Sequence, residues 1–125
     1  LPLFIGIGNL AEAGTLHDGS SIESLVRALD GYRVDGLFAM DSFPPSISAT
    51  LPLIKEHFSG FVGVYPHVGL GDTDPEVVIA SEIEHSRYYS SEEFSRYAAT
   101  WREMGTQIIG RCRGTDASYI AKLVR

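Results

Sequence analysis

The sequence predicts an α/β fold made of four consecutive strand–helix units, and two observations support this class. Four short apolar runs of strand length recur along the chain. Each run is followed by a segment with helical spacing of apolar residues or with helix-capping signals. This alternation is typical of a parallel sheet whose strands are joined by helical crossovers. The 125 residues suit one domain, so we assign residues 1–125 to a single domain.

The first unit begins with the apolar run LPLFIGI, Leu1 to Ile7, which predicts a buried strand. After a loop that contains Gly and Asp, Ser20 and Glu23 have the spacing of a capping box and predict the start of a helix. The apolar face of this helix is predicted to consist of Ile22, Leu25, Val26 and Leu29.

The second unit begins with VDGLFAM, Val34 to Met40, which predicts the next strand. A helix is expected in TLPLIKEHF, after the turn residues DSFPPS. Because proline lacks the N–H that a helix interior requires, Pro52 fits the first turn of this helix better than its middle. We therefore predict that the helix begins near Thr50.

The third unit begins with FVGVYPH, Phe61 to His67, which predicts a strand, and a long polar loop follows up to about Ser90. Ser90 and Glu93 form a second capping-box pattern, which predicts the start of the next helix. Gly105 marks the end of that helix, because glycine commonly follows the last helical residue.

The fourth unit consists of a predicted strand TQIIGRC, Thr106 to Cys112, a turn RGTD, and a last helix in ASYIAKLVR with Thr115 or Asp116 as its N-cap. All four strand runs are nearly continuous in apolar character, so the strands are expected to be buried on both faces. Two architectures fit this pattern. One is half of a (β/α)8 TIM barrel, and the other is a small open parallel α/β sheet of the doubly wound type.

The charge balance and the single cysteine exclude several classes of protein. Ten Lys and Arg residues against 16 Asp and Glu residues give a formal net charge of −6, which argues against a nucleic-acid partner. No apolar run approaches the roughly 18 residues of a membrane span. One cysteine cannot form an internal disulfide, and we expect a cytoplasmic protein. The chain starts without Met inside a strand-like run, so we expect that it was processed or belongs to a longer chain.

Polar residues follow each predicted strand, at the edge where parallel α/β folds bind their ligands. The residues at these strand ends are Gly8 and Asn9, then Asp41 and Ser42, then His67, and finally Cys112 with Arg113. Three of them, Asp41, His67 and Cys112, are of types that bind metals. Each also has a simpler interpretation, respectively as a turn residue, a surface histidine and a small buried hydrophobic residue.

The turn after Cys112 is a candidate seat for a small anion or carboxylate. Gly114 permits close approach of the backbone, the next helix offers free N–H groups, and Arg113 adds a positive charge. The flanking guanidiniums would also favour the thiolate form of Cys112. An ordinary strand-to-helix turn with a cap fits the same residues.

Over nearly all of its length, the chain resembles the carboxyl-terminal half of a homocysteine S-methyltransferase domain. The resemblance rests on the order and spacing of LPLFIGIGNLAEAGTLHDGSSIESLVRAL, VDGLFAMDSFPPS, VGVYPHVG and YAATWREMGTQIIGRCRGTDASYIAKL. It implies a half-barrel of four β/α units. It also implies a small-molecule substrate, a thiol such as homocysteine or another amino acid, to which an activated methyl group is transferred.

The family's chemistry implies a zinc ion held by three thiolates, one from an Asn-Cys strand end and two from a paired-cysteine motif. Here Met40 and Asp41 stand at the Asn-Cys pair, while Cys112 and Arg113 stand at the paired cysteines. His67 stands at the asparagine of a Tyr-Pro-Asn element. We therefore expect zinc-dependent methyl transfer to be impaired or lost, with Cys112 and Asp41 as the remaining candidate ligands of a zinc ion.

The residues predicted to bind the substrate are Asn9, Asp41, His67, Arg113 and Gly114. Two alternatives to a methyltransferase-like domain are open: a non-catalytic domain that binds a small carboxylate or amino acid in a regulatory role, and a half-barrel that acts only through assembly. An isolated half-barrel leaves two open sheet edges and one uncovered face. We therefore expect a homo-oligomer or the remainder of a longer chain to cover them.

Overall fold

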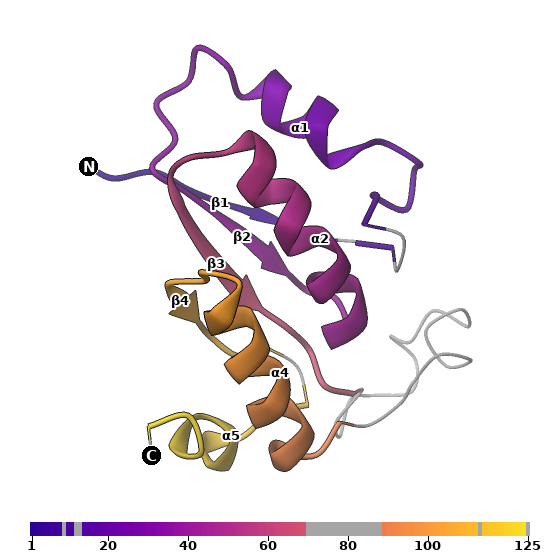
Figure 1. The fold of residues 1–125 in the computed structure, drawn as a ribbon, viewed down its shortest axis with the longest axis vertical. Coiled ribbons are helices and arrows are strands. Elements are labelled where there is room, and N and C mark those ends of the chain that lie inside the picture. The colour runs from indigo at the N-terminus through magenta and orange to yellow at the C-terminus, as the bar shows by residue number, and fades with distance from the viewer. Residues whose placement is uncertain (9, 12–13, 70–88, 113, 125) are drawn as a thin grey trace.

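The computed structural model describes residues 1–8, 10–11, 14–69, 89–112 and 114–124, and the structural statements below concern these residues. Four parallel strands form one sheet: β1 (Phe4–Ile7), β2 (Gly36–Met40), β3 (Phe61–Tyr65) and β4 (Ile108–Ile109). The helices are α1 (Ile22–Ala28), α2 (Pro44–His57), α4 (Ser91–Glu103) and α5 (Ala117–Ala121). The predicted α/β class with four strand–helix units is confirmed (Figure 1).

The order of the strands distinguishes between the two predicted architectures. It is β1-β2-β3-β4, and every neighbouring pair is parallel. A doubly wound sheet reverses its strand order at a switch point, whereas a (β/α)8 barrel adds each strand beside the previous one. The helices α1, α2 and α4 lie side by side over one face of the sheet (Figure 1). Sequential order and one-sided helices are the arrangement of a barrel segment.

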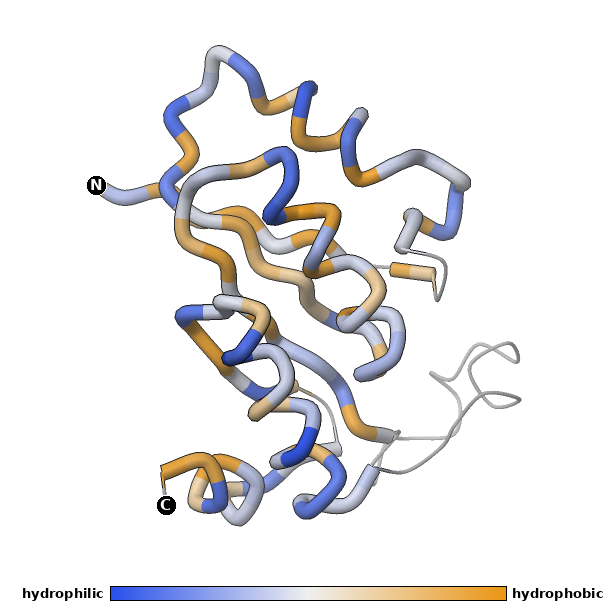
Figure 2. Tube along the Cα trace, in the orientation of Figure 1, coloured by the Kyte–Doolittle hydropathy of each residue, from blue (hydrophilic) through white to orange (hydrophobic). Residues whose placement is uncertain are grey.

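The core lies between the sheet and these helices. Alternate strand residues point into it, among them Leu37 and Ala39 of β2 and Val62 and Val64 of β3. The helices contribute Ile47, Leu51 and Ile54 from α2, and Phe94, Ala98 and Trp101 from α4. Figure 2 shows the same division along the helices, with apolar residues toward the strands and hydrophilic residues on the outside.

The prediction that the strands are buried on both faces is wrong. The residues that point away from the helices include four large exposed side chains, Phe4, Phe61, Tyr65 and Ile108. Phe61 is the most exposed of them, at 53% of its full surface. An apolar run in the sequence does not reveal whether a second layer of structure is present. Here the helices supply only one layer, so the inner face of the barrel segment is bare.

The strands are shorter than predicted. The regular ladder of backbone hydrogen bonds between neighbouring strands stops early, and single hydrogen bonds hold the residues beyond it. Before β1, the Leu3 carbonyl accepts from the Asp35 N–H at 2.8 Å, and the Asp35 carboxylate accepts from the Leu3 N–H at 2.8 Å. Before β4, the side-chain oxygen of Gln107 accepts from the Val62 N–H at 2.8 Å. At the other end, β3 stops at Tyr65 instead of the predicted His67. The fourth strand keeps only Ile108–Ile109 of the predicted Thr106 to Cys112.

The helix caps agree with the sequence in three of four cases. The capping box of α4 is confirmed, since Ser90 Oγ accepts from the Glu93 N–H and Glu93 Oε2 accepts from the Ser90 N–H. Gly105, at φ 88°, ends this helix. Asp116 is the N-cap of α5. The predicted box at Ser20 is wrong, because Ser21 caps α1 by accepting from the N–H three residues later.

The prediction that α2 begins near Thr50 is also wrong. The helix begins at Pro44, where a missing N–H costs nothing, and Pro52 lies inside it. Pro52 is exposed, while Ile47, Leu51 and Ile54 on the opposite side are buried. The burial of this apolar face therefore outweighs the lost hydrogen bond of one proline. Among the described residues, no helix has the length and apolar character to cross a membrane.

We predict that Pro52→Ala stabilises the protein. Alanine restores the N–H inside α2 and removes the clash of the ring with the preceding turn, so the free energy of unfolding should rise by about 1–3 kcal/mol. Urea denaturation followed by circular dichroism measures the change. Pro45→Ala is the matched control, because Pro45 lies in the first turn of the same helix and should shift stability little. Equal effects of the two substitutions would contradict the prediction.

Candidate functional site

The carboxyl ends of three strands bring Asp41, His67 and Cys112 together, and we call these three residues the strand-end cluster. Asp41 Oδ1 lies 3.5 Å from His67 Nδ1 and 3.8 Å from Cys112 Sγ. Cys112 and Asp41 are 71 residues apart in the chain. Backbone hydrogen bonds fix their positions: the Asp41 N–H donates to the Tyr65 carbonyl at 3.0 Å, and the Cys112 N–H to the Pro66 carbonyl at 3.0 Å. The predicted convergence of these three side chains is present.

Asp41 adopts a backbone conformation that few residues use. Its φ is 48°, and it is the one non-glycine residue of the described ranges in the left-handed region. Aspartate tolerates this region better than most residues. The turn places the Asp41 carboxylate between the ends of β3 and β4, with 48% of its side chain exposed. Its Oδ1 atom makes both contacts, and its Oδ2 atom accepts no hydrogen bond within the described part of the chain.

His67 is held in place by packing. The Phe43 ring meets the imidazole edge-to-face, with ring centroids 4.2 Å apart. The backbone N–H of His67 donates to the Ser42 carbonyl at 3.2 Å. Only 15% of the His67 side chain is exposed. The sequence does not indicate this packing, because Phe43 follows a different strand from His67.

Ser42 links the strand ends to one another. Its buried hydroxyl accepts from the Leu10 N–H at 3.0 Å and donates to the Met40 carbonyl at 3.0 Å. The hydroxyl therefore ties the loop after β1 to the end of β2, while the Ser42 carbonyl holds the segment after β3. The sequence placed Ser42 at a strand end but did not indicate this role. The predicted binding residue Asn9, in the loop after β1, lies outside the described residues.

The turn after Cys112 depends on a close contact between two backbones. Gly114 has φ 79°, and a Cβ atom added to it would lie 2.6 Å from the Gly69 carbonyl oxygen. Thr115 Oγ1 donates to the Cys112 carbonyl at 2.6 Å, which closes the turn. Arg113, predicted to bind substrate here, is not among the described residues.

The start of α5 is occupied by its own cap. Asp116 Oδ1 accepts from the Ser118 N–H at 2.7 Å. The Ser118 hydrogen bonds, and secondarily the charge of Arg111, lower the pKa of Asp116 below its usual range. Arg111 Nη1 donates to the Thr115 carbonyl at 2.7 Å. A carboxylate of the protein already takes the position that an external anion would need at this helix of five residues.

The strand-end cluster does not have the donor set of the three-thiolate zinc site that the resemblance implies. It offers one thiol, one imidazole and one carboxylate, and a single oxygen of Asp41 contacts both of the other groups. Across the described ranges, no group of three His, Cys, Asp or Glu side chains is arranged to hold a metal ion. The cluster is therefore better described as a hydrogen-bonded group around Asp41.

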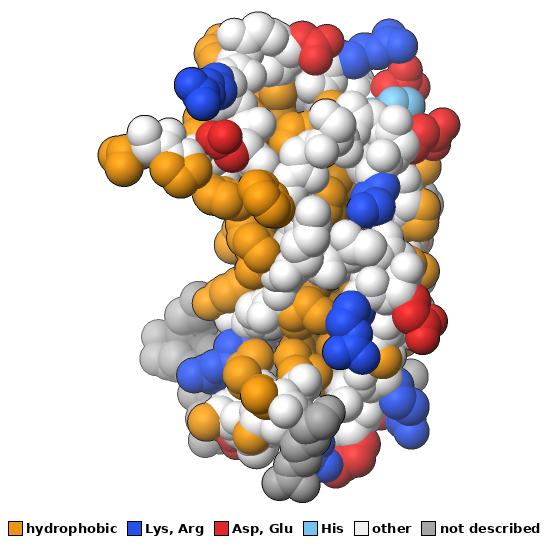
Figure 3. Space-filling model, turned by 60° about the vertical axis from the view of Figure 1, so that its left-hand side comes forward, with side chains coloured by type: hydrophobic (Ala, Val, Ile, Leu, Met, Phe, Trp, Pro, Cys, Tyr) orange, Lys and Arg blue, Asp and Glu red, His pale blue; other side chains and the backbone are white. Residues whose placement is uncertain are grey.

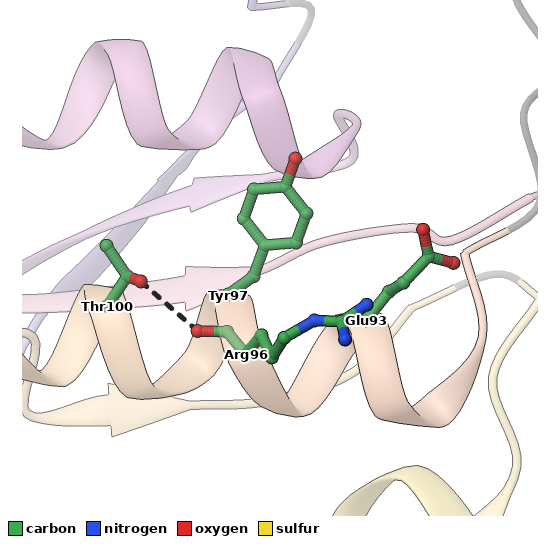
Figure 4. A pocket seen from close by; sticks show the side chains of 4 residues that line it. All are labelled: Glu93, Arg96, Tyr97 and Thr100. Atoms are coloured by element: carbon green, nitrogen blue, oxygen red, sulfur yellow. Dashed lines mark hydrogen bonds between the residues drawn. The ribbon is translucent and has the colours of Figure 1, made fainter.

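Two surface hollows lie elsewhere, along α4. One, of about 290 Å³, is lined by Glu93, Arg96, Tyr97 and Thr100. In Figure 4 the Tyr97 ring extends toward α2 while Arg96 follows its own helix, so the side chains do not converge on one point. The other, of about 320 Å³, is lined by Glu92, Ser95, Arg96 and Lys122. Neither is lined by a residue of the strand-end cluster.

Comparisons with known proteins agree with this architecture. The family model described as homocysteine S-methyltransferase matches residues 2–125. The metallated form of the homocysteine methyltransferase MmuM from Escherichia coli has a TM-score of 0.70 at 21% identity, over 98% of this chain and 34% of that chain. Its apo form has a TM-score of 0.69 at 20% identity, over 98% of this chain and 39% of that chain.

The oxidised form of the same enzyme has a TM-score of 0.66 at 22% identity, over 92% of this chain and 33% of that chain. The chain thus spans little more than a third of the solved structures that it resembles. Likeness at this level of identity shows a shared fold, and it confirms the partial barrel. No curated protein sequence matches the chain.

We predict that Gly114→Ala disrupts the turn that carries Cys112. The new Cβ would meet the Gly69 carbonyl and would also force alanine into a left-handed conformation. Gly19→Ala is the matched control, because Gly19 has φ 85° with no atom within 4 Å of the added Cβ. Thermal unfolding should show a loss of about 1 kcal/mol for Gly19→Ala and a clearly larger loss for Gly114→Ala. Equal losses would mean that the contact with Gly69 adds no cost.

Proposed function

The chain belongs to the homocysteine S-methyltransferase family, and on this premise we propose that it is the carboxyl-terminal half of a methyltransferase-type barrel with impaired chemistry. The strand-end cluster binds a small thiol or amino acid of the homocysteine class. The zinc-dependent methyl transfer implied by the family resemblance is lost or strongly reduced in this chain. We infer both statements from Asp41, His67 and Cys112 and from their positions at the strand ends.

The observation that carries the proposal is the contact of Asp41 Oδ1 with both His67 Nδ1 and Cys112 Sγ. Zinc prefers several soft thiolate ligands, whereas the group that contacts Cys112 Sγ here is a hard carboxylate oxygen. In the resemblance, thiolates stand at the positions of Asp41 and Arg113. Replacing them by a carboxylate and a guanidinium removes two soft ligands and introduces a fixed positive charge beside the third.

The proposed ligand follows from the charge that the cluster exposes. The Asp41 side chain is 48% exposed at the carboxyl edge of the sheet, and a carboxylate there attracts the ammonium group of an amino acid. His67, held by Phe43, limits the freedom of Asp41 Oδ1. The ammonium group of the ligand therefore pairs with Asp41 Oδ2, and its thiol end lies toward Cys112.

The alternative functions have less support. A carboxylate seat at Gly114 competes with Asp116, whose own carboxylate takes the N–H of Ser118 at the start of α5. A role in assembly alone assigns no purpose to the contact of Asp41 with both His67 and Cys112. Both alternatives predict that substitution of Asp41 leaves amino-acid binding unchanged.

We predict that the zinc site returns when its thiolates are restored. The double variant Asp41→Cys, Arg113→Cys presents three cysteines with Cys112 and should retain about one zinc per chain after dialysis, because three thiolates suit zinc. The wild-type chain should retain far less. Elemental analysis measures the zinc, and transfer of methyl groups to homocysteine measures activity. The double variant Asp41→Ser, Arg113→Ser is the control for loss of the original side chains.

One zinc per wild-type chain, together with turnover of homocysteine, would show that the proposed impairment is wrong. A cysteine variant that folds but binds no zinc would show that positions 41, 112 and 113 do not form the site. Circular dichroism of all variants separates these outcomes from unfolding.

We also predict that Asp41→Asn weakens binding of homocysteine to the wild-type site by about tenfold or more, since a charged hydrogen bond is lost. Titration followed by nuclear magnetic resonance measures weak binding directly. Glu56→Gln is the matched control, because it removes an exposed acidic charge on α2 outside the strand-end cluster. Equal dissociation constants of the two variants would show that Asp41 does not contact the ligand, which would contradict the proposed ammonium contact.

A further inference from the structure

Three Asp-Gly pairs occur in this chain: Asp18–Gly19, Asp30–Gly31 and Asp35–Gly36. An aspartate that precedes glycine can isomerise, because glycine has no side chain to hinder the approach of its nitrogen to the neighbouring carboxyl carbon. The reaction requires rotation of the peptide unit between the two residues and a carboxyl group that can swing toward it. Since all three pairs share the sequence feature, their local structure decides which of them reacts.

The pair Asp35–Gly36 is held by the sheet. The Asp35 carbonyl accepts from the Phe61 N–H at 2.9 Å, and the Gly36 N–H donates to the Leu3 carbonyl at 3.3 Å. The Asp35 carboxylate accepts from the Leu3 N–H at 2.8 Å. Both ends of the peptide unit and the carboxylate are therefore engaged, and rotation of the unit would break these bonds at the start of β2.

The pair Asp18–Gly19 is held by its own turn. The Gly19 N–H donates to the Leu16 carbonyl at 2.9 Å, and Asp18 Oδ1 accepts from the Ser20 N–H at 2.9 Å. Hydrogen bonds from Ser20, first from its backbone N–H and then from its side chain, lower the pKa of Asp18 below its usual range. Because the carboxyl group loses its hydroxyl as water only when it is protonated, this pKa lowers the reactive fraction at a given pH.

The pair Asp30–Gly31 forms the centre of the turn that follows α1. The Tyr32 N–H donates to the Leu29 carbonyl at 3.0 Å and closes the turn around the two residues. Gly31 has φ 89°, a value that glycine adopts readily at the third position of a turn. The closing hydrogen bond thus involves neither the carbonyl nor the N–H of the peptide unit between Asp30 and Gly31.

This peptide unit makes no hydrogen bond within the described part of the chain, at its Asp30 carbonyl or at its Gly31 N–H. In the same ranges, the Asp30 carboxylate has no hydrogen-bond or ion-pair partner. Both residues are exposed, and a Cβ atom added to Gly31 would meet no atom within 4 Å. Of the three pairs, Asp30–Gly31 therefore has the least to break before its atoms can approach each other.

We propose that Asp30 is the residue at which this chain converts spontaneously to isoaspartate. The Gly31 nitrogen attacks the side-chain carboxyl carbon of Asp30 and forms a C–N bond. The carboxyl hydroxyl leaves together with the amide proton as one water molecule, which gives a five-membered succinimide. Another water molecule then opens the ring. Cleavage at the side-chain carbonyl restores aspartate, and cleavage at the main-chain carbonyl gives isoaspartate.

The modified turn lies between α1 and β2, so it is at the opposite edge of the sheet from the strand-end cluster. Neither residue of the pair belongs to the apolar inner face of the sheet, which Figure 3 shows along the hollowed left-hand side of the molecule. The inference therefore does not rest on the proposed function or on what covers that face. Its test uses no ligand and no metal.

The experiment incubates the chain at neutral pH and body temperature in water enriched in the heavy oxygen isotope. Ring opening incorporates one heavy oxygen atom, and mass spectrometry of the digested chain locates it, while chromatography separates isoaspartyl from aspartyl peptides. We expect Asp30 to react at least about tenfold faster than Asp18 and Asp35, because hydrogen bonds that must break lower the population of the reactive conformation. In denaturant the three sites should react at similar rates, since all three precede glycine.

Two charge-preserving variants are the matched controls. Asp30→Glu keeps the carboxylate but requires a six-membered ring, so it should remove most of the isoaspartate that the folded chain forms. Asp18→Glu makes the same change at a pair that is held by hydrogen bonds, and it should leave the total nearly unchanged. Circular dichroism before and after the incubation checks that each chain is folded.

Three outcomes would overturn the proposal. The first is equal rates at the three pairs in the folded chain. The second is faster incorporation of heavy oxygen at Asp18 or Asp35 than at Asp30. The third is an Asp30→Glu variant that accumulates as much isoaspartate as the wild type, since the modification would then lie elsewhere.

Discussion

Parallel pairing of four strands in chain order is the constraint on which the rest of this structure depends. It directs all carboxyl ends to one edge of the sheet and requires every connection to cross back over the sheet. Because these crossovers have the same hand, the helices gather on one face. The convergence of Asp41 with Cys112, 71 residues away, follows directly from this pairing. So does the bare apolar face on the other side.

The strand-end cluster is held in place by contacts from the residues around it. Ser42 joins the loop after β1 to β2, and Phe43 packs against the His67 ring. At its centre, Asp41 contacts a thiol and an imidazole through one oxygen. The fold therefore brings one thiol, one imidazole and one carboxylate together at the strand ends.

The bare apolar face and the strand-end cluster meet at the carboxyl edge of the sheet, where Met40 precedes Asp41 in the chain. Closure of the barrel would shield the face from water and leave the cluster at the mouth, where a small ligand has access. The apolar face and the cluster are thus adjacent surfaces of one sheet. Gly36 and Gly63 leave room on this face for the rings of Phe4 and Phe38.

The sequence by itself determined which segments are strands and helices, the parallel class of the sheet and the polar residues that follow each strand. These properties follow from local patterns: apolar runs, the capping box at Ser90 and the stop at Gly105. Tertiary structure decided the start of α2, because burial of its apolar face outweighs the local preference of Pro52. It also decided that one face of each strand is bare and that Asp41 contacts both His67 and Cys112. These features depend on strand register and on which layers are present, and no short stretch of sequence carries either one, because both arise from contacts between distant residues.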